Sequence, residues 1–167
     1  MKVAKLLSVL LLGLFLSTTA HAKDLKIAYV ELGNVFNNYQ KTKDFDAVLQ
    51  KETQAAQSQI DDKVKNIRDE QSKLALMKDD EKQKLQATIE KEANDLRDFQ
   101  KQKRAELSKK FEDMRKEIIL EIEKIVSDMA KKDNYNYIFN DTVLLYGDQE
   151  SNVTKTVLDT LNAGYKK

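Results

Sequence analysis

Residues 34–132 contain nothing that ends a helix. The chain has no proline, and none of its four glycines lies in this stretch. Proline costs about 3 kcal/mol and glycine about 1 kcal/mol inside a helix relative to alanine, so a long stretch without either favours helix. Charged residues make up 34% of the chain, above the roughly 25% of an ordinary globular protein. We therefore predict long, solvent-exposed helices rather than a compact mixed fold.

Apolar residues in this stretch recur every eleven residues, in the row Leu85, Leu96, Leu107, Ile118 and Met129. Eleven residues in three turns correspond to about 3.67 residues per turn, a period that keeps an apolar seam straight or slightly right-handed. The seam is narrow, because it also contains Gln100 and Lys103.

The seam is interrupted at residues 77–81, where Asp79, Asp80 and Glu81 cluster as acidic residues do in the first turn of a new helix. A turn there makes residues 34–132 an antiparallel helical hairpin. Each arm would have about 40 residues, or about 60 Å at 1.5 Å per residue. One uninterrupted helix is the alternative, but the hairpin returns both ends of the stretch to one place.

Three short segments outside the hairpin have the composition of strands, namely residues 25–30, 135–140 and 143–146. Asn152 is placed to cap a final helix that carries Val157 and Leu161 and is closed by Gly164. We predict an α+β fold. Residues 23–33 and 133–167 form a small β-stranded body, and residues 34–132 form a coiled-coil-like hairpin that protrudes from it, with its tip near residues 77–81.

Neither part buries much apolar area. A sheet of three short strands is marginal by itself, and the narrow seam gains little at roughly 25 cal/mol per Å² of buried surface. Several copies that share one core would relieve both problems. We expect an oligomer whose shared core includes Leu25, Ile27, Tyr29, Ile138, Val143 and Leu145.

Residues 1–22 have the pattern of a cleavable secretory signal. Lys2 and Lys5 precede an apolar run at residues 6–16, and Ala20-His21-Ala22 has the form of a cleavage site. The run is shorter than the about 20 residues that span a membrane. A retained membrane anchor is the alternative, and we expect export followed by cleavage after Ala22.

The residue types of the mature chain exclude several kinds of chemistry. There is no cysteine, and the one histidine, His21, lies in the segment expected to be removed. Thiolate metal sites, cysteine nucleophiles and histidine proton shuttles are thereby excluded. We predict no catalytic, metal or cofactor site, and an enzyme is the least favoured class of function.

Residues 97–116 carry eight basic and four acidic side chains, on a chain with 29 basic and 28 acidic residues in all. Arg97, Lys101 and Arg104 are spaced so that they share one helix face. Contact with anionic lipid headgroups or acidic proteins is one interpretation. A solvated helix face, balanced by acids on neighbouring arms, is the other. The candidate contact residues are Arg97, Lys101, Lys103, Arg104, Lys109 and Lys110.

The order and spacing of these features resemble the Skp/OmpH family of periplasmic chaperones. The matching segments are Ile27-Ala28-Tyr29-Val30, Val35-Phe36, Lys73-Leu74-x-x-Met77-Lys78, Val143-x-x-Tyr146 and Asn152-Val153-Thr154-x-x-Val157-Leu158. The resemblance implies a homotrimer with three helical arms around a cavity. It also implies unfolded outer-membrane β-barrel proteins as clients, no nucleotide or metal cofactor, and a lipopolysaccharide-binding stretch at residues 99–110.

The function that we expect is therefore an ATP-independent periplasmic holdase that keeps unfolded outer-membrane proteins from aggregating. Better-known members of the family are strongly basic, whereas this chain has a formal net charge of +1. Any attraction to acidic partners should then be local, because charges more than about 8–10 Å apart are screened by salt. The alternative function is a structural coiled-coil spacer of the cell envelope, without client binding. We expect no nucleic-acid partner.

Overall fold

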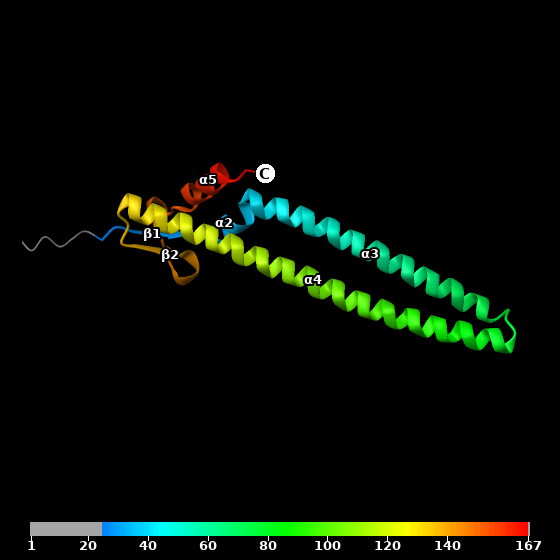
Figure 1. Ribbon diagram of the computed structural model, residues 1–167. Coiled ribbons are helices and arrows are strands. Elements are labelled where there is room, and N and C mark those ends of the chain that lie inside the picture. The colour runs from blue at the N-terminus through cyan, green and yellow to red at the C-terminus, as the bar shows by residue number, and fades with distance from the viewer. Residues whose placement is uncertain (1–24, 167) are drawn as a thin grey trace, which may run out of the picture.

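The computed structural model describes residues 25–166, and the expected signal sequence at residues 1–22 lies outside them. A long hairpin projects from a small body that contains both ends of the described chain (Figure 1). The elements follow in the order β1 (Ile27–Val30), α2 (Leu32–Asn38), α3 (Gln40–Leu74), α4 (Asp79–Asp133), β2 (Tyr137–Asn140) and α5 (Thr154–Gly164). None of the helices within residues 25–166 has a stretch apolar enough to cross a bilayer.

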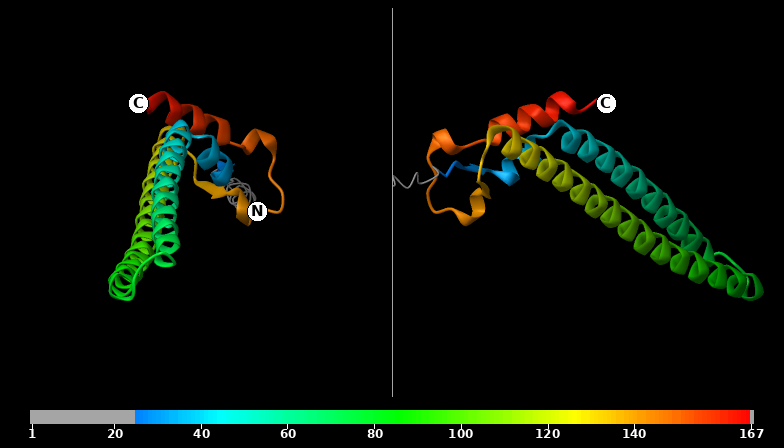
Figure 2. Two further views of the ribbon diagram at one scale, coloured as in Figure 1. Left: turned by 90° about the vertical axis from the view of Figure 1, so that its right-hand side faces the viewer. Right: turned by 60° about the vertical axis from the view of Figure 1, so that its left-hand side comes forward.

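The hairpin predicted for the middle of the chain is present. Its two helices run side by side and turn at residues 75–78 (Figures 1 and 2), slightly before the predicted tip. Asp79, Asp80 and Glu81 occupy the first turn of α4, where the helix dipole favours acidic side chains. The arms are unequal, because α4 has 55 residues and α3 has 35, and α4 continues into the body.

The first helix is not continuous, contrary to the prediction of an unbroken arm from residue 34. It begins at Leu32 and breaks at Tyr39, whose ψ of 130° is extended. The backbone N–H of Gln40, left free by the break, donates to the side-chain oxygen of Asn162 in α5 (2.9 Å). Val35 and Tyr39 are both buried at this bend. The bend is stabilised by α5 rather than by a proline or glycine, so the local sequence does not predict it.

The sheet has two strands rather than the three that we predicted. β1 and β2 pair in parallel, with Ile27 opposite Tyr137 and Tyr29 opposite Phe139. The segment at residues 143–146 is not a strand. Val143 ends a short 3₁₀ turn, Asp141–Val143, and residues 144–146 lie between it and a second one, Gln149–Ser151. This segment has the composition of a strand but no strand to pair with among the described residues.

The core lies where the root of the hairpin meets the body. Ile118 and Ile122 of α4 pack in one cluster with Val35 of α2, Val157 of α5 and Ala28 of β1. Farther out along the arm, only Ala56 and Ile89 are buried among the described residues. Since local stability follows local packing, the outer arm is the less stable part of the hairpin.

A polar cluster joins β1 to the start of α5. The side-chain oxygen of Asn152 accepts from the N–H of Thr154 (2.9 Å), the first residue of α5. The N-cap of α5 is Val153, one residue after the cap that we predicted. The carboxylate of Glu31 accepts hydrogen bonds from Asn34 and from Asn152, both 2.8 Å long, and these bonds lower its pKa. The N–H of Glu31 donates to the Thr154 hydroxyl (2.8 Å).

We predict that Gly147→Ala destabilises the body. A Cβ at this position would lie 2.5 Å from Cε1 of Tyr29, a ring that is itself buried. The expected loss is about 1–3 kcal/mol of unfolding free energy, as for other overpacked sites, measured by urea denaturation.

Gly33→Ala is the matched control for this prediction. A Cβ at Gly33 would meet nothing within 4 Å, and the residue lies inside α2. Alanine should be neutral there or stabilising by about 0.5–1 kcal/mol. Equal effects of the two substitutions would contradict the packing argument.

Candidate functional surfaces

The root of the arm is fixed by a cluster of charged and aromatic side chains. The Lys41 ammonium lies 2.6 Å from Glu117 and 2.5 Å from Glu121, so it links α3 to α4. The Tyr39 hydroxyl donates to Glu121 (3.1 Å), and its ring packs edge-on against Tyr165, with 5.8 Å between the ring centroids. These contacts join α3, α4 and the end of α5 at one point.

The same cluster shifts two pKa values upward. Burial raises the pKa of Tyr39 to about 12, helped by its hydrogen bond to Glu121. Burial by itself would lower the pKa of Lys41, but the hydrogen bonds to Glu117 and Glu121 outweigh it, and the pKa is raised. Both groups therefore stay protonated to a higher pH than an ordinary tyrosine or lysine.

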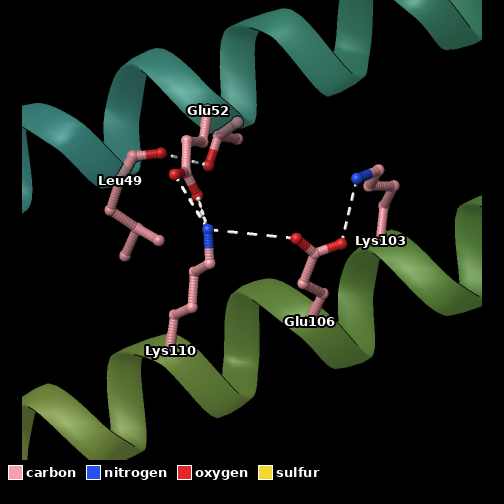
Figure 3. A network of polar contacts seen from close by, with 6 residues as sticks. Leu49, Glu52, Lys103, Glu106 and Lys110 are labelled. Carbon is pink, nitrogen blue, oxygen red and sulfur yellow. Dashed lines mark hydrogen bonds and ion pairs between the residues drawn. The ribbon is translucent and has the colours of Figure 1, made fainter.

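A second polar network crosses the hairpin beyond the first, between α3 and α4 (Figure 3). The Lys110 ammonium of α4 bonds both carboxylate oxygens of Glu52 on α3, at 2.8 and 2.7 Å, and lies 3.9 Å from Glu106. Glu106 also pairs with Lys103 (2.9 Å). The hydrogen bond from Lys103 lowers the pKa of Glu106, and the hydrogen bond to Glu52 raises the pKa of Lys110.

The structure divides the six basic candidate residues into two groups. Lys103, Lys109 and Lys110 each have an acidic partner, and Lys109 pairs with Asp113 at 2.5 Å. Arg97, Lys101 and Arg104 form no ion pair with any described residue. For the first group, charge balance within the arm is the observed role. The second group remains a candidate for external contact.

The three unpaired basic residues lie together, as their spacing predicted. Arg97, Lys101 and Arg104 line one open groove along α4, with Gln100, Ala105 and Ser108. Their side chains are exposed. The groove has a cavity volume of about 530 Å³. Three guanidinium or ammonium groups without internal partners can hold an anionic group at this surface.

The body exposes a large apolar surface. Four of the six residues predicted for an oligomer core are exposed in the single chain: Leu25 at 61%, Ile27 at 46%, Val143 at 70% and Leu145 at 108%. The other two serve the chain's own fold, since Tyr29 is buried and Ile138 packs against the core cluster. The oligomer core as a whole stays a prediction.

Three aromatic residues of this surface were not among the residues predicted for the oligomer core, and Tyr137 and Phe139 are exposed rather than buried in the body. Tyr137 and Phe139 stack on the exposed side of β2, with 5.9 Å between their ring centroids, and Tyr146 is 85% exposed. The alternation of Tyr137 and Phe139 with Asn136 and Ile138 was a usable signal. Exposed contiguous apolar patches of this kind mark sites of interaction with another protein.

Metal ligands are not grouped in the part of the chain that the structure describes. Among residues 25–166, no three side chains of the types His, Cys, Asp and Glu lie close enough together to hold an ion.

Comparison with known proteins gives one family and one fold. The sequence model of the family described as "Outer membrane protein (OmpH-like)" matches residues 26–161. No curated protein matches the chain. A solved structure from Caulobacter crescentus CB15, of an OmpH-like candidate outer membrane chaperone, is similar with a TM-score of 0.80 and 13% sequence identity. The similarity covers 86% of this chain and 87% of that one.

We predict that stability falls steeply above pH 10, in part through Tyr39. Its raised pKa means that the folded chain keeps the phenol neutral while the unfolded chain ionises it. The stability contributed by Tyr39 is full below pH 10 and is lost as pH rises toward 12, by up to about 2 kcal/mol. Urea denaturation at several pH values between 9 and 12 measures this loss.

Tyr39→Phe is the control, because it keeps the ring against Tyr165 and removes the titrating group. The variant should lose less stability than the wild type over the same pH interval. Parallel pH profiles for the two proteins would show that Tyr39 does not carry the effect.

Proposed function

Because the chain belongs to the OmpH-like outer membrane protein family, we propose that it is an ATP-independent periplasmic holdase. It captures unfolded outer-membrane β-barrel proteins between helical arms and prevents their aggregation. The observation that supports this most is the long hairpin, which projects far beyond the small core (Figure 2) and presents scattered apolar side chains among many charges. The proposal includes no catalytic step, no nucleotide and no metal.

The physical requirements of a holdase match such an arm. Strands of an unfolded outer-membrane barrel alternate apolar and polar residues, and they aggregate in water through their free edges. A holder of such chains needs a wide surface with weak, adaptable contacts rather than one specific pocket. Exposed Val48, Phe111 and Met77 supply such contacts on the arm. A client that stays mobile in the cavity also loses less conformational entropy on binding.

Assembly is the second element of the proposal. We propose that copies of the chain pack together through the exposed apolar surface of the body, which includes Val143, Leu145 and Tyr146. The resemblance to the Skp/OmpH family implies three copies. A shared body would direct three arms to the same side and enclose a cavity between them, without burial of the arms themselves.

The test is suppression of aggregation. A β-barrel outer-membrane protein diluted from urea should stay soluble when the protein is present at one assembly per client. Leu145→Glu should abolish this protection, because Leu145 is fully exposed in the single chain and a buried carboxylate would disfavour assembly. Light scattering gives aggregation and, in the absence of client, the mass of the assembly.

Two outcomes would contradict the proposal. A wild-type assembly with no effect on aggregation would support the alternative function, a structural spacer of the envelope. If the wild type is a monomer in solution, there is no cavity between arms of different copies, and the proposed mechanism fails. Lys155→Glu is the control for Leu145→Glu, because Lys155 is an exposed residue of α5 in the same body, and it should leave the assembly intact.

The basic groove supports a further part of the proposal. We propose that Arg97, Lys101 and Arg104 contact anionic groups, such as those of lipopolysaccharide or an anionic membrane surface. What favours this is that all three lack an internal acidic partner among the described residues and line one groove. With a near-neutral chain, the attraction should act only at short range and weaken with salt.

We predict that the triple change of Arg97, Lys101 and Arg104 to Gln reduces binding to lipopolysaccharide about tenfold or more at low salt. Each lost contact with an anionic group near the surface accounts for about 1 kcal/mol. Co-sedimentation with lipopolysaccharide measures the binding. The matched control changes Lys103, Lys109 and Lys110 to Gln, which removes the same charge from paired positions. An equal loss in both variants would mean that net charge alone determines the binding.

A further inference from the structure

The two long sides of the hairpin differ in chemistry. One side carries the basic groove with Arg104. Asp113 lies nine residues farther along α4, which is half a turn out of phase at 3.6 residues per turn, so it faces the other side. That other side has a groove of about 340 Å³ between α3 and α4, lined by the apolar residues Phe45, Val48, Leu49 and Met114. We call it the apolar groove.

Every charged residue that lines the apolar groove already has an ion-pair partner. Lys41 pairs with Glu117 at 2.6 Å, and Lys110 pairs with Glu52 at 2.7 Å, in both cases across the two helices. Asp113 pairs with Lys109 at 2.5 Å. The charges around the groove are therefore neutralised by ion pairs within the chain itself. A charged segment entering the groove would have to compete with these pairs, whereas an uncharged segment would not.

Part of the apolar lining packs against the core of the body, and part of it is exposed to solvent. Met114 is buried in the core cluster, and Phe45 packs against that cluster, so the body holds the floor of the groove in place. Val48 is 53% exposed. The chain's own fold therefore leaves a preformed apolar surface at the root of the arm, where Met114 and Phe45 meet the core cluster.

We propose that the apolar groove binds the uncharged apolar side chains of an extended, unfolded protein segment. The inference rests on the holdase function proposed above and names the side of the arm that contacts the client. A barrel strand presents apolar residues on one of its two faces, and the neutralised rim of the groove matches such a face in charge. The polar, basic side of the hairpin lacks this match.

The chain offers a clean experiment, because it has no cysteine. Val48→Cys introduces one thiol in the groove, and Val64→Cys introduces one at an exposed valine of the same helix outside the groove. The rate of alkylation by iodoacetamide is measured with and without a β-barrel outer-membrane protein diluted from urea. We expect the bound client to slow alkylation at position 48 at least fivefold and at position 64 less than twofold.

A second pair of variants tests affinity. Val48→Gln should weaken binding of the same client about fivefold to tenfold, while Val64→Gln should change it less than twofold. Both substitutions place a good helix former at a helical position, so loss of folding does not explain a difference between them.

The outcomes separate this inference from the function on which it rests. If the wild type does not hold the client in solution, the proposed function fails. If it does, and the variants at positions 48 and 64 behave alike, only the inference about the groove is wrong. Slow alkylation of Val48→Cys in the assembly without client would mean that a second copy of the chain covers the groove. This result would also overturn the inference that the groove binds the client.

Discussion

The architecture depends on the packing of one stretch of α4 against the rest of the body. Ile118 and Ile122 are almost fully buried there, against α2, α5 and the sheet. The same helix then runs outward as one arm of the hairpin. Because α4 is continuous through both regions, the body anchors the arm at its root. The network of Lys41, Glu117 and Glu121 adds a second point of attachment. The arm can then project without a large core of its own.

Much of this fold could be predicted from the sequence, because its signals are local and repeated. The lack of proline, the eleven-residue repeat and the acids at residues 79–81 predicted the hairpin and nearly its tip. The bend at Tyr39 could not be predicted, since α5 stabilises it from a position more than a hundred residues away. The prediction of a third strand was wrong for a related reason. Residues 143–146 have strand-forming side chains, but a strand also needs a partner, and composition does not reveal one.

The candidate surfaces divide in the same way. The shared face of Arg97, Lys101 and Arg104 follows from helix periodicity, and the structure confirms it. The ion pair between Lys110 and Glu52 depends on the register of α3 against α4, and the sequence repeat does not determine this register. The division of basic residues into paired and unpaired groups gives the hairpin two unlike sides. One side is neutral and apolar near the body, and the other is basic and open to solvent.

The parallel pairing of β1 with β2 affects how the molecule folds. Ile27 and Tyr137 are neighbours in the sheet, and the entire hairpin lies between them in the chain. Pairing of such distant residues makes folding slow relative to the formation of local helices. As the chain is made from its N-terminal end, the helices of the hairpin can form first, but the sheet must wait until the residues of β2 are present. We therefore expect the proposed assembly to form late, only after whole chains are complete.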